Sequence, residues 1–365
     1  MTSSQEIKIG ALASTLAVGG AERQLATLAR GLRERGYRFS FFILRGAGAV
    51  GNELHDDGFD VDVNVAKRPA RWPGVIGGLR GCHLLAALDH NDVLRLLPAF
   101  SRVLPPYVVL YHLQEKPPDG WLRALGRAGA VVAVADSQLA LLREAGIGSA
   151  RVIANGVAVP PAATVADRRL AREALGLPTD AAVAAAVSRL SPEKGIDVLL
   201  EALAEADEES RPFLAVAGDG PERSRLEGFA RAKLGGRFTF LGELDDVSPV
   251  YRAADIFVLP SRRESAPLAL LEGMAYGLAA VAAAVGDVPA ILSGGAGVTF
   301  TPGSSGELAR ALTGLAGQPA KRLEMGALAR AAVARRYSLR RMLDGYDALF
   351  KKLLLGNKAD VADDA

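Results

Sequence analysis

The sequence has few of the residues on which several classes of protein depend. Its 365 residues include one cysteine, Cys82, so no internal disulfide can form, and a single thiol fits a reducing compartment. With no nearby base, Cys82 is expected to be a small buried residue rather than a catalytic thiol. No Cys/His cluster has the spacing of a zinc site, and neither a Walker lysine nor a Gly-x-Ser-x-Gly elbow is present.

Long apolar runs are also missing. The longest, such as Leu278–Val285, fall far below the roughly 20 residues of a membrane helix. Residues Met1–Gly10 lack the basic and then apolar pattern of a signal peptide. We therefore expect a cytoplasmic protein, at most peripheral on the inner leaflet of a membrane.

An excess of charge of either sign is missing as well. The formal net charge is +2, so nucleic acid is not expected as a partner. A small group of basic side chains in the first half would either contact anionic lipid or belong to a solvated loop. These residues are Lys67, Arg68, Arg71 and Arg80.

What the sequence does contain is typical of a large α/β protein. Half of its residues are hydrophobic, which allows an extensive core, and its length fits two domains of roughly 150–200 residues. Short β-rich apolar runs alternate with helical patterns, as in parallel sheets with crossover helices. We expect two Rossmann-like, doubly wound domains facing across a cleft, with a linker near Val157–Pro161. The predicted parts are 1–157, 158–337 and a C-terminal helix with a disordered tail, 338–365, that crosses back to the first domain.

The predicted elements follow from apolar periodicity. The strands of the first half are Ile7–Ala13, Arg38–Leu44, Val61–Val65, Leu84–Leu88, Tyr107–Tyr111 and Ala130–Val134. Its clearest helices are Ala21–Arg35 and Gln138–Ala145, the latter with Asp136 and Ser137 as N-caps.

The same rhythm continues in the second half. Its strands are Ala181–Val187, Phe213–Ala217, Phe238–Leu241, Ile256–Leu259 and Ala279–Ala284. Its helices are Ile196–Glu205, Pro221–Lys233 with proline in the first turn, Leu268–Tyr276 and most of the chain after Ser304.

Candidate binding loops follow the predicted strands, because ligands of such sheets bind at the carboxyl ends of the strands. Gly19 and Gly20 precede a helix whose free N–H groups could hold phosphate, or they form a plain tight turn. Arg189 and Lys194, five residues apart in a strand-to-helix loop, could face one diphosphate or be solvated cations. The loop Gly218-Asp219-Gly220 could brace a nucleotide base or merely turn the chain.

The segment Ser261–Glu272 is the most informative. Glu264 lies in the loop after a strand and Glu272 about one turn into the next helix. An unpaired carboxylate is costly in such an apolar setting, whereas hydroxyl-rich ligands would offset the cost; surface charge is the alternative. Ser265, Ala266, Pro267 and Leu268 lead into this helix, and its start, with the N–H groups that this segment offers outside the proline, could hold phosphate.

Two histidines end or follow strands of the first half. His112 and His90 could each act as a general base, orient an acceptor or be structural. Asp60-Val61-Asp62 has the Asp-x-Asp pattern of some metal sites, but it lies in an alternating strand and is interpreted as solvent-facing charge.

Taken together, the order and spacing of these motifs resemble the retaining, GT-B-fold glycosyltransferases of family 4. The resemblance covers nearly the whole chain. The matching stretches are Gly19–Glu22, Asn155–Val157, Val187–Asp197, Ala217–Glu222, Leu241-Gly242, Tyr251–Asp255, Glu264–Glu272 and Val285–Pro289. The chain departs from the family pattern at four positions: Ala158, Gly273, Ala279 and Ala290.

The resemblance implies roles for individual residues. Arg189 and Lys194 would neutralise the donor diphosphate in place of a metal, so no metal or other cofactor is expected. Glu264 would hold donor-sugar hydroxyls and Glu272 the ribose, while the Gly19-Gly20 loop would approach the diphosphate. The remaining assignments place His112 near the reacting carbon and His90, His112 and Asn155 around the acceptor.

The function implied is transfer of a hexose from a UDP- or GDP-sugar to a saccharide or lipid-linked acceptor in bacterial envelope, lipopolysaccharide or exopolysaccharide assembly. Two alternatives remain open on the same fold. One is a sugar-nucleotide epimerase or hydrolase, and the other is a non-catalytic, nucleotide-binding partner subunit.

Overall fold

The computed structural model describes the chain apart from residues 1–5, 18, 64–71, 101–102 and 363–365. Lys67, Arg68 and Arg71, three of the four members of the expected basic group, therefore lie outside the described residues. The chain divides into two compact units. Unit 1 comprises Met1–Gly156 and Arg340–Ala365, and unit 2 comprises Val157–Leu339.

Unit 1 contains a seven-stranded parallel sheet in the order β3-β2-β1-β4-β5-β6-β7. Its strands are β1 (Ile7–Thr15), β2 (Tyr37–Gly46), β3 (Asp60–Val63), β4 (Leu84–Leu88), β5 (Tyr107–Tyr111), β6 (Ala130–Ala133) and β7 (Ala150–Val152). The order reverses at β1, as in a doubly wound sheet. Six of these strands were predicted; β7 was not, because three half-buried residues at a sheet edge give no apolar run.

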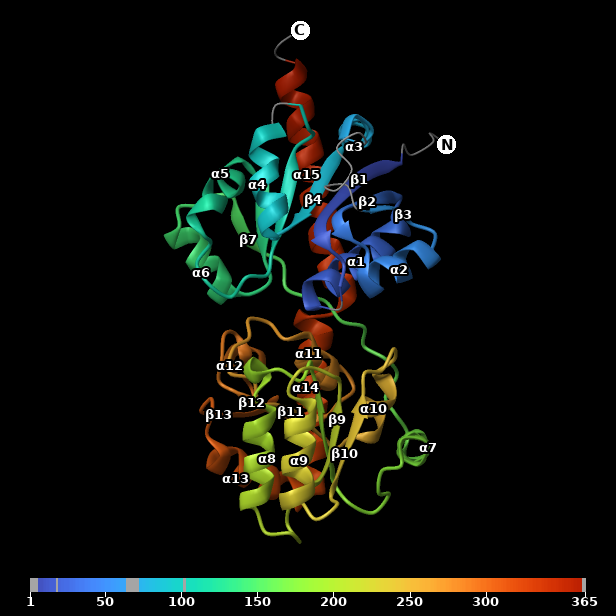
Figure 1. Ribbon diagram of the computed structural model, residues 1–365, viewed down its shortest axis with the longest axis vertical. Helices are drawn as coiled ribbons and strands as arrows, with labels where there is room; N and C mark the ends of the chain where they lie inside the picture. Colours follow the sequence, from blue (N-terminus) through green and yellow to red (C-terminus); the bar gives the residue numbers. More distant parts are fainter. Residues whose placement is uncertain (1–5, 18, 64–71, 101–102, 363–365) are drawn as a thin grey trace. The chain divides into compact units, whose positions relative to one another are not determined.

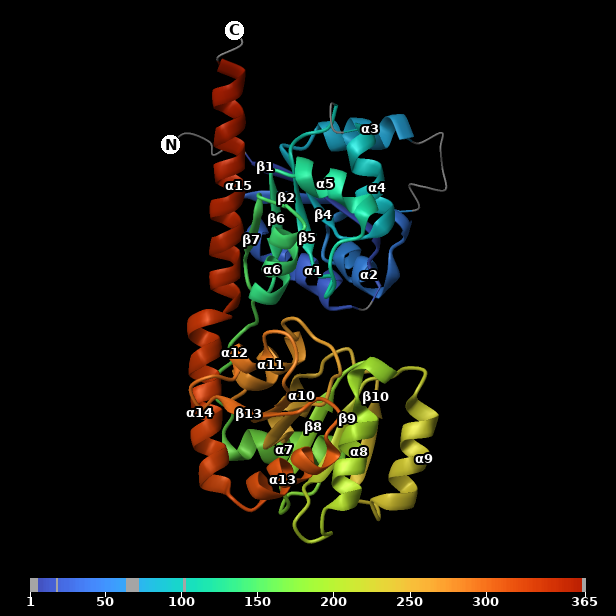
Figure 2. The same ribbon diagram turned by 90° about the vertical axis from the view of Figure 1, so that its left-hand side faces the viewer.

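The two faces of this sheet are covered by different helices. Two helices pack near β2: α1 (Gly20–Arg33) and α15 (Leu339–Ala362), whose Phe350 lies against Tyr37. The helix α2 (Gly48–Asp56) contacts α1 and β3. Figure 2 shows α15 alongside unit 1, opposite α3 and α4. The apolar core of that other face includes residues of α3 (Trp72–Arg80), α4 (Asn91–Phe100), α5 (Leu122–Arg127) and α6 (Asp136–Glu144).

Unit 2 contains a six-stranded parallel sheet in the order β10-β9-β8-β11-β12-β13. Its strands are β8 (Val183–Val187), β9 (Phe213–Ala217), β10 (Phe238–Gly242), β11 (Ile256–Leu259), β12 (Ala279–Ala283) and β13 (Gly297–Phe300). The last of these, a four-residue edge strand, was not predicted. The order again reverses at the first strand, so loops after β8 and β11 lie next to each other at the carboxyl edge.

Helices cover both faces of this sheet as well (Figure 1). Successive residues of each strand point to opposite faces of the sheet, so they contribute to two separate cores. One core includes residues of α8 (Ile196–Glu205), α9 (Arg223–Lys233) and α13 (Ser305–Ala316). The other includes residues of α10 (Ser248–Ala253), α11 (Leu268–Ala275), α12 (Val288–Ile291) and α14 (Pro319–Arg336), while α7 (Val165–Leu175) joins a smaller cluster.

Two helix starts differ from the sequence predictions. The N-cap of α6 is Ala135, so Asp136 and Ser137 lie in the first turn instead of capping it. α9 begins at Arg223 with Glu222 as its N-cap, and Pro221 therefore precedes the helix. The Glu222 N–H donates to the Leu190 carbonyl at 3.0 Å, and because of this contact with the neighbouring loop the helix begins after the proline.

Cys82 is buried, as expected from the sequence. Burial raises the pKa of its thiol, which keeps the side chain in the neutral, unreactive form.

Candidate active site

Four loops of unit 2 meet at the carboxyl edge of its sheet. They follow β8, β9, β11 and β12, which are neighbours in the sheet. Glycines hold these loops in backbone contact. A Cβ at Gly218 would lie 1.9 Å from the Ser188 carbonyl oxygen, and one at Gly286 would lie 2.1 Å from that of Glu264. No side chain fits at such distances, so these glycines fix the positions of the polar residues around them.

Lys194 and Glu264 form the central ion pair of this edge. Lys194 ends the one-turn 3₁₀ helix η4 (Pro192–Lys194) after β8, and its Nζ donates to Glu264 Oε1 at 2.6 Å. The Ser261 hydroxyl donates to the same oxygen at 3.0 Å and is itself fully buried. The Glu264 side chain is 8% exposed and that of Lys194 26%. Within the described residues no hydrogen bond reaches Glu264 Oε2, so that oxygen is available to a ligand.

Glu272 lies on α11 and has a different partner. The Tyr251 hydroxyl, from α10, donates to Glu272 Oε2 at 2.7 Å. Tyr251 is buried and its ring stacks on Tyr276, with the centroids 5.3 Å apart. The two glutamates therefore do not form a carboxylate pair with each other. Each is compensated by a protein group, and the cost of burial that the sequence suggested is already offset without a ligand.

A second ion pair ties the loop after β11 to the start of α8. Arg262 donates to both oxygens of Asp197, at 2.9 and 2.8 Å, and its backbone N–H donates to the Glu193 carbonyl. The hydrogen bonds from Arg262 hold the pKa of Asp197 below its usual value against the opposing effect of burial. Ser191 likewise lowers the pKa of Glu193 by a hydrogen bond. These contacts fix both ends of the segment that carries Lys194.

The remaining predicted donor residues of unit 2 lie in the loops that carry this pair and in the loop after β9. Arg189 is exposed, and the structure brings it into the loop that precedes Lys194. Asp219 is exposed and accepts hydrogen bonds from the Gly220 N–H and from Arg223, which favours the turn-forming interpretation of its loop. α11 begins after Pro267, and the Ser265 carbonyl accepts a hydrogen bond from the Asp287 N–H.

One departure from the family pattern has a structural reason. A Cβ at Gly273 would lie 2.6 Å from the ring of Phe257 on β11. An alanine therefore does not fit here while phenylalanine occupies position 257, since ring atoms of a core strand cannot move aside cheaply.

A separate cluster of polar residues lies at the carboxyl edge of the unit 1 sheet. Gly19 is the N-cap of α1, and the Glu22 carboxylate folds back toward it. Burial raises the pKa of Glu22, but its interactions with His90 and with its own backbone N–H hold it below its usual value. His90 Nδ1 accepts the Ser14 N–H at 2.9 Å, which leaves Nε2, 3.6 Å from Glu22 Oε1, to carry the proton.

His112, which follows β5, belongs to the same cluster of polar residues. Asp89 Oδ2 accepts the backbone N–H groups of both His112 and Leu113 at 2.7 Å, which orients the start of this loop. His112 Nδ1 is buried, has no hydrogen bond among the described residues and lies 3.9 Å from Asp89 Oδ1. Asn155, the third expected acceptor residue, is buried after β7.

Sequence reasoning missed the partners of the glutamates. Tyr251 belongs to a motif that carried the resemblance and Ser261 begins the segment that contains both glutamates, but neither was assigned a place in the site. The signal for Ser261 was its position three residues before Glu264, within one loop. No local signal connects Tyr251 to Glu272, 21 residues away, because their contact depends on how α10 and α11 pack.

Two kinds of feature are absent from the described part of the chain. Among those residues no group of three or more His, Cys, Asp or Glu side chains is arranged to hold a metal ion. Within the same residues no helix combines the length and apolar character needed to cross a membrane.

Two parallel-sheet units with polar loops at their carboxyl edges define a two-domain, Rossmann-like α/β protein of the GT-B class. The family model for "Glycosyl transferases group 1" matches residues 167–332, and the model for "Glycosyltransferase Family 4" matches residues 18–159. The two matches together span most of both units. The chain belongs to the family 4 glycosyltransferases.

Individual relatives agree with this assignment. D-inositol 3-phosphate glycosyltransferase 2 of Catenulispora acidiphila is 39% identical over 44% of this chain and 41% of its own length. The D-inositol 3-phosphate glycosyltransferase of Mycobacterium tuberculosis is also 39% identical, over 38% of this chain and 30% of the relative. The chain therefore matches less than half the length of these curated relatives.

A solved structure shows the fold over a larger part of the chain. Anabaena Alr3699/HepE, crystallised in complex with UDP-glucose, superimposes with a TM-score of 0.81 at 24% identity. The likeness covers 95% of this chain and 100% of that one. At this identity the similarity establishes the GT-B fold.

Proposed function

We propose that this protein is a retaining glycosyltransferase that moves a hexose from a UDP- or GDP-sugar to a saccharide or lipid-linked acceptor. The reaction would serve bacterial envelope, lipopolysaccharide or exopolysaccharide assembly at the cytoplasmic face of a membrane. The observation that carries the proposal is the Lys194–Glu264 pair. It lies at the carboxyl edge of the unit 2 sheet, in loops whose glycines allow close backbone contact. Family membership supports it.

The donor diphosphate is assigned to Lys194 and Arg189. Lys194 keeps two of its three N–H donors after bonding to Glu264, and Arg189 offers an exposed guanidinium on the same loop. Two cations balance the charge of a diphosphate, so the proposed reaction needs no metal. The Gly19-Gly20 start of α1 is a further phosphate contact in the proposal, because its N-cap residue is a glycine, which has no side chain to cap the helix.

The two glutamates hold hydroxyl groups in the proposed complex. Glu264 uses Oε1 for Lys194 and Ser261 and leaves Oε2 for donor-sugar hydroxyls. Glu272, positioned by Tyr251, binds the ribose diol. Because protein groups already compensate both glutamates, the proposal uses them as hydrogen-bond acceptors rather than as a general acid and base pair.

The leaving diphosphate gains negative charge as its bond to the sugar breaks. Cations placed at this position stabilise the transition state more than the bound donor, so Lys194 and Arg189 act mainly on turnover. His112, oriented through Asp89, and His90, oriented by Ser14 and Glu22, are the proposed contacts of the acceptor, together with Asn155.

Thermal unfolding with a panel of nucleotide sugars tests the donor assignment. A UDP- or GDP-sugar at 100 times its Kd should stabilise the protein by about 2.7 kcal/mol, while the matching free sugar should not. UDP-glucose, with which HepE was crystallised, is the first compound to test, and D-inositol 3-phosphate belongs in the acceptor panel because of the relatives' names. If no nucleoside diphosphate or nucleotide sugar shifts the melting temperature, the proposal is wrong.

Incubation with donor alone separates the alternatives on this fold. Release of free sugar indicates a hydrolase, and a changed stereocentre in the recovered nucleotide sugar indicates an epimerase. Binding without turnover under any acceptor indicates a partner subunit. A transferase should instead give a product that contains both sugar and acceptor.

A further inference from the structure

The loop after β5, residues 112–118, is held by more side chains than the proposed function uses. β5 lies between β4 and β6 in the sheet, so this loop lies between the loops that follow those two strands. From the β4 side, Asp89 accepts two backbone N–H groups at the start of the loop. Two further side chains, Gln138 and Tyr111, bond to the loop and have so far been given no role.

Gln138 joins this loop to the one that follows β6. It lies in the first turn of α6 and is fully buried. Its Oε1 accepts the Val134 N–H at 2.9 Å, and its Nε2 donates to the Leu113 carbonyl at 3.1 Å. The first contact is a local one at a helix start, whereas the second reaches 25 residues back to the neighbour of His112. Movement of either loop would leave a buried polar group without a partner, so this amide fixes their spacing.

Tyr111 fixes the middle of the loop. Its side chain is fully buried at the end of β5, and its hydroxyl donates to the Glu115 carbonyl at 2.7 Å. Burial, together with the charges of Asp89 and Glu115, raises the pKa of Tyr111, so the hydroxyl remains a donor at physiological pH. Side chains therefore hold two N–H groups and two carbonyls of the backbone between His112 and Glu115.

The segment that follows returns to the loop after β4. The indole N–H of Trp121, a buried residue, donates to Asn91 Oδ1 at 3.1 Å. His90 lies between Asp89 and Asn91 in the sequence, and both of these neighbours bond to the segment that begins with His112. The two histidines proposed to contact the acceptor are therefore positioned by the same set of contacts.

The His112 ring depends on this backbone for its position. Within the described residues no hydrogen bond reaches its Nδ1, which is buried and lies 3.9 Å from Asp89 Oδ1. A displacement of the backbone would therefore move the ring with it. Displacement of a group near the reacting atoms by about 1 Å can cost about 100-fold in rate.

We infer that Gln138 and Tyr111 are positioning residues, which hold His112 in place for the acceptor by fixing the backbone after β5. The inference rests on the proposed transferase function and extends it to two buried side chains that act through the loop rather than on a ligand.

Nuclear magnetic resonance of the histidine rings tests the positions without any transfer reaction. The sequence has four histidines, so selective isotope labelling of histidine gives few ring signals, and His112→Gln identifies those of His112 by their loss. Tyr111→Phe and Gln138→Met should each shift or broaden the His112 signals. Tyr111→Phe removes a single oxygen and keeps the test valid if the Gln138 variant does not fold. Unmoved His112 signals in the folded variants would overturn the inference.

Tyr107→Phe is the matched control. Tyr107 is buried at the other end of β5, and its hydroxyl donates to the Ala124 carbonyl at 2.6 Å, so this change also removes one hydrogen bond to a carbonyl. It should leave the His112 signals in place. Equal shifts of these signals in the Tyr107 and Tyr111 variants would show that any loss of a hydrogen bond on β5 disturbs the ring, and would overturn the specific role of Tyr111.

Kinetics with a functional donor connect the position of His112 to the acceptor. Tyr111→Phe should lower kcat/KM for the acceptor at least ~tenfold and raise the acceptor KM, while the Kd of the donor stays unchanged. Loss of folded protein alone would lower kcat and leave KM as it is. Normal acceptor kinetics in a Tyr111→Phe variant with displaced His112 signals would overturn the positioning role. Failure of every nucleotide sugar to bind would refute the proposed function instead, and the ring signals would still show whether the two side chains hold His112.

Discussion

Lys194 is the residue whose replacement tests the proposed chemistry most directly. Lys194→Ala should lower kcat at least ~100-fold, because one cation that stabilises the leaving diphosphate is lost, while KM for the donor changes less. Steady-state kinetics with the best nucleotide sugar measures this. Lys233→Ala, at the exposed end of α9, is the matched control and should retain full turnover.

The same substitution leaves Glu264 buried without its counter-ion. A melting temperature should therefore accompany the kinetics, so that loss of fold is separated from loss of chemistry. Near-normal turnover in a folded Lys194→Ala variant would contradict the role assigned to this side chain.

The Arg262–Asp197 pair gives a pH-dependent prediction. Its hydrogen bonds lower the pKa of Asp197 in the folded state, so the pair stabilises the fold above the usual Asp pKa of about 3.9 and this contribution is lost as pH falls through the depressed value. Arg262→Met should reduce the free energy of unfolding by about 1 kcal/mol or less at pH 7, since Arg262 is 41% exposed. Urea unfolding of both proteins should show this difference shrinking in acid. A difference that stays constant down to about pH 2 would contradict the assignment.

At the scale of elements, the glycines between loops control the geometry of the site. Gly286→Ala combines a φ of +50° with a Cβ 2.1 Å from the Glu264 carbonyl oxygen, whereas Gly294→Ala has a similar φ of +73° in open space. The second should cost only the backbone strain, about 1–2 kcal/mol. The first should cost more and weaken donor binding at least ~tenfold, because it displaces the loop that carries Glu264.

Calorimetric binding of the donor and thermal unfolding of both variants provide the measurement. Equal donor affinities for the two variants would show that the contact between Gly286 and the Glu264 loop has no part in holding the site.

Most elements of both sheets could be predicted because their apolar runs are long and bounded by turn residues. Leu84–Leu88, Tyr107–Tyr111 and Phe213–Ala217 were predicted with the bounds that the structure gives. The missed strands, β7 and β13, are short edge strands whose pairing with a neighbour, rather than their own sequence, makes them strands. The α6 N-cap was wrong because a polar residue next to a helix start gives the same signal at the N-cap and in the first turn.

At the scale of the whole molecule, α15 contributes to unit 1 from the far end of the chain. Phe350 is fully buried against Tyr37, and the Tyr37 hydroxyl donates to Asp347 at 2.7 Å. Burial and the Asp347 charge raise the pKa of Tyr37, so its hydroxyl stays protonated and continues to donate at any physiological pH. Completion of this core therefore requires residues more than 300 positions apart.

Phe350→Ala should destabilise unit 1 by about 3–5 kcal/mol through loss of buried ring contacts. Leu355→Ala, on the same helix but 67% exposed, should stay within about 0.5 kcal/mol of the original protein. Hydrogen exchange resolves the two units: amides of β1 and β2 should exchange faster in the Phe350 variant, and those of β8 and β9 should not. Faster exchange in β8 and β9 alone would show that α15 does not stabilise unit 1.

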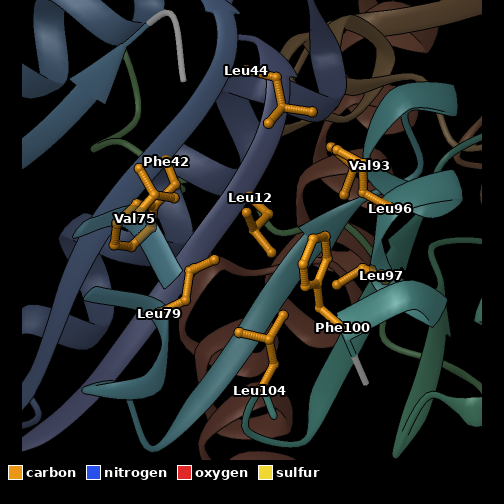
Figure 3. A pocket seen from close by; sticks show the side chains of 10 residues that line it. All are labelled: Leu12, Phe42, Leu44, Val75, Leu79, Val93, Leu96, Leu97, Phe100 and Leu104. Atoms are coloured by element: carbon orange, nitrogen blue, oxygen red, sulfur yellow. The ribbon is translucent and has the colours of Figure 1, made fainter. Parts of the chain in front are cut away.

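The sequence by itself determined the fold class. Apolar periodicity dictates parallel sheets, and parallel sheets bring the loops after their strands to one edge, so the loops of Lys194 and Glu264 were expected at the same edge; a shared role in donor binding came from the resemblance to family 4. The contacts of each side chain depended on tertiary structure. The pairing of Glu264 with Lys194, of Glu272 with Tyr251 and of Asp197 with Arg262 joins residues from different elements, whose approach is set by packing and by glycines that admit no Cβ. A small apolar pocket between α3, α4 and the sheet of unit 1 (Figure 3) has the same origin, because a periodic stripe on α4 shows that a helix is buried but not how completely α3 and the sheet fill the space beside it.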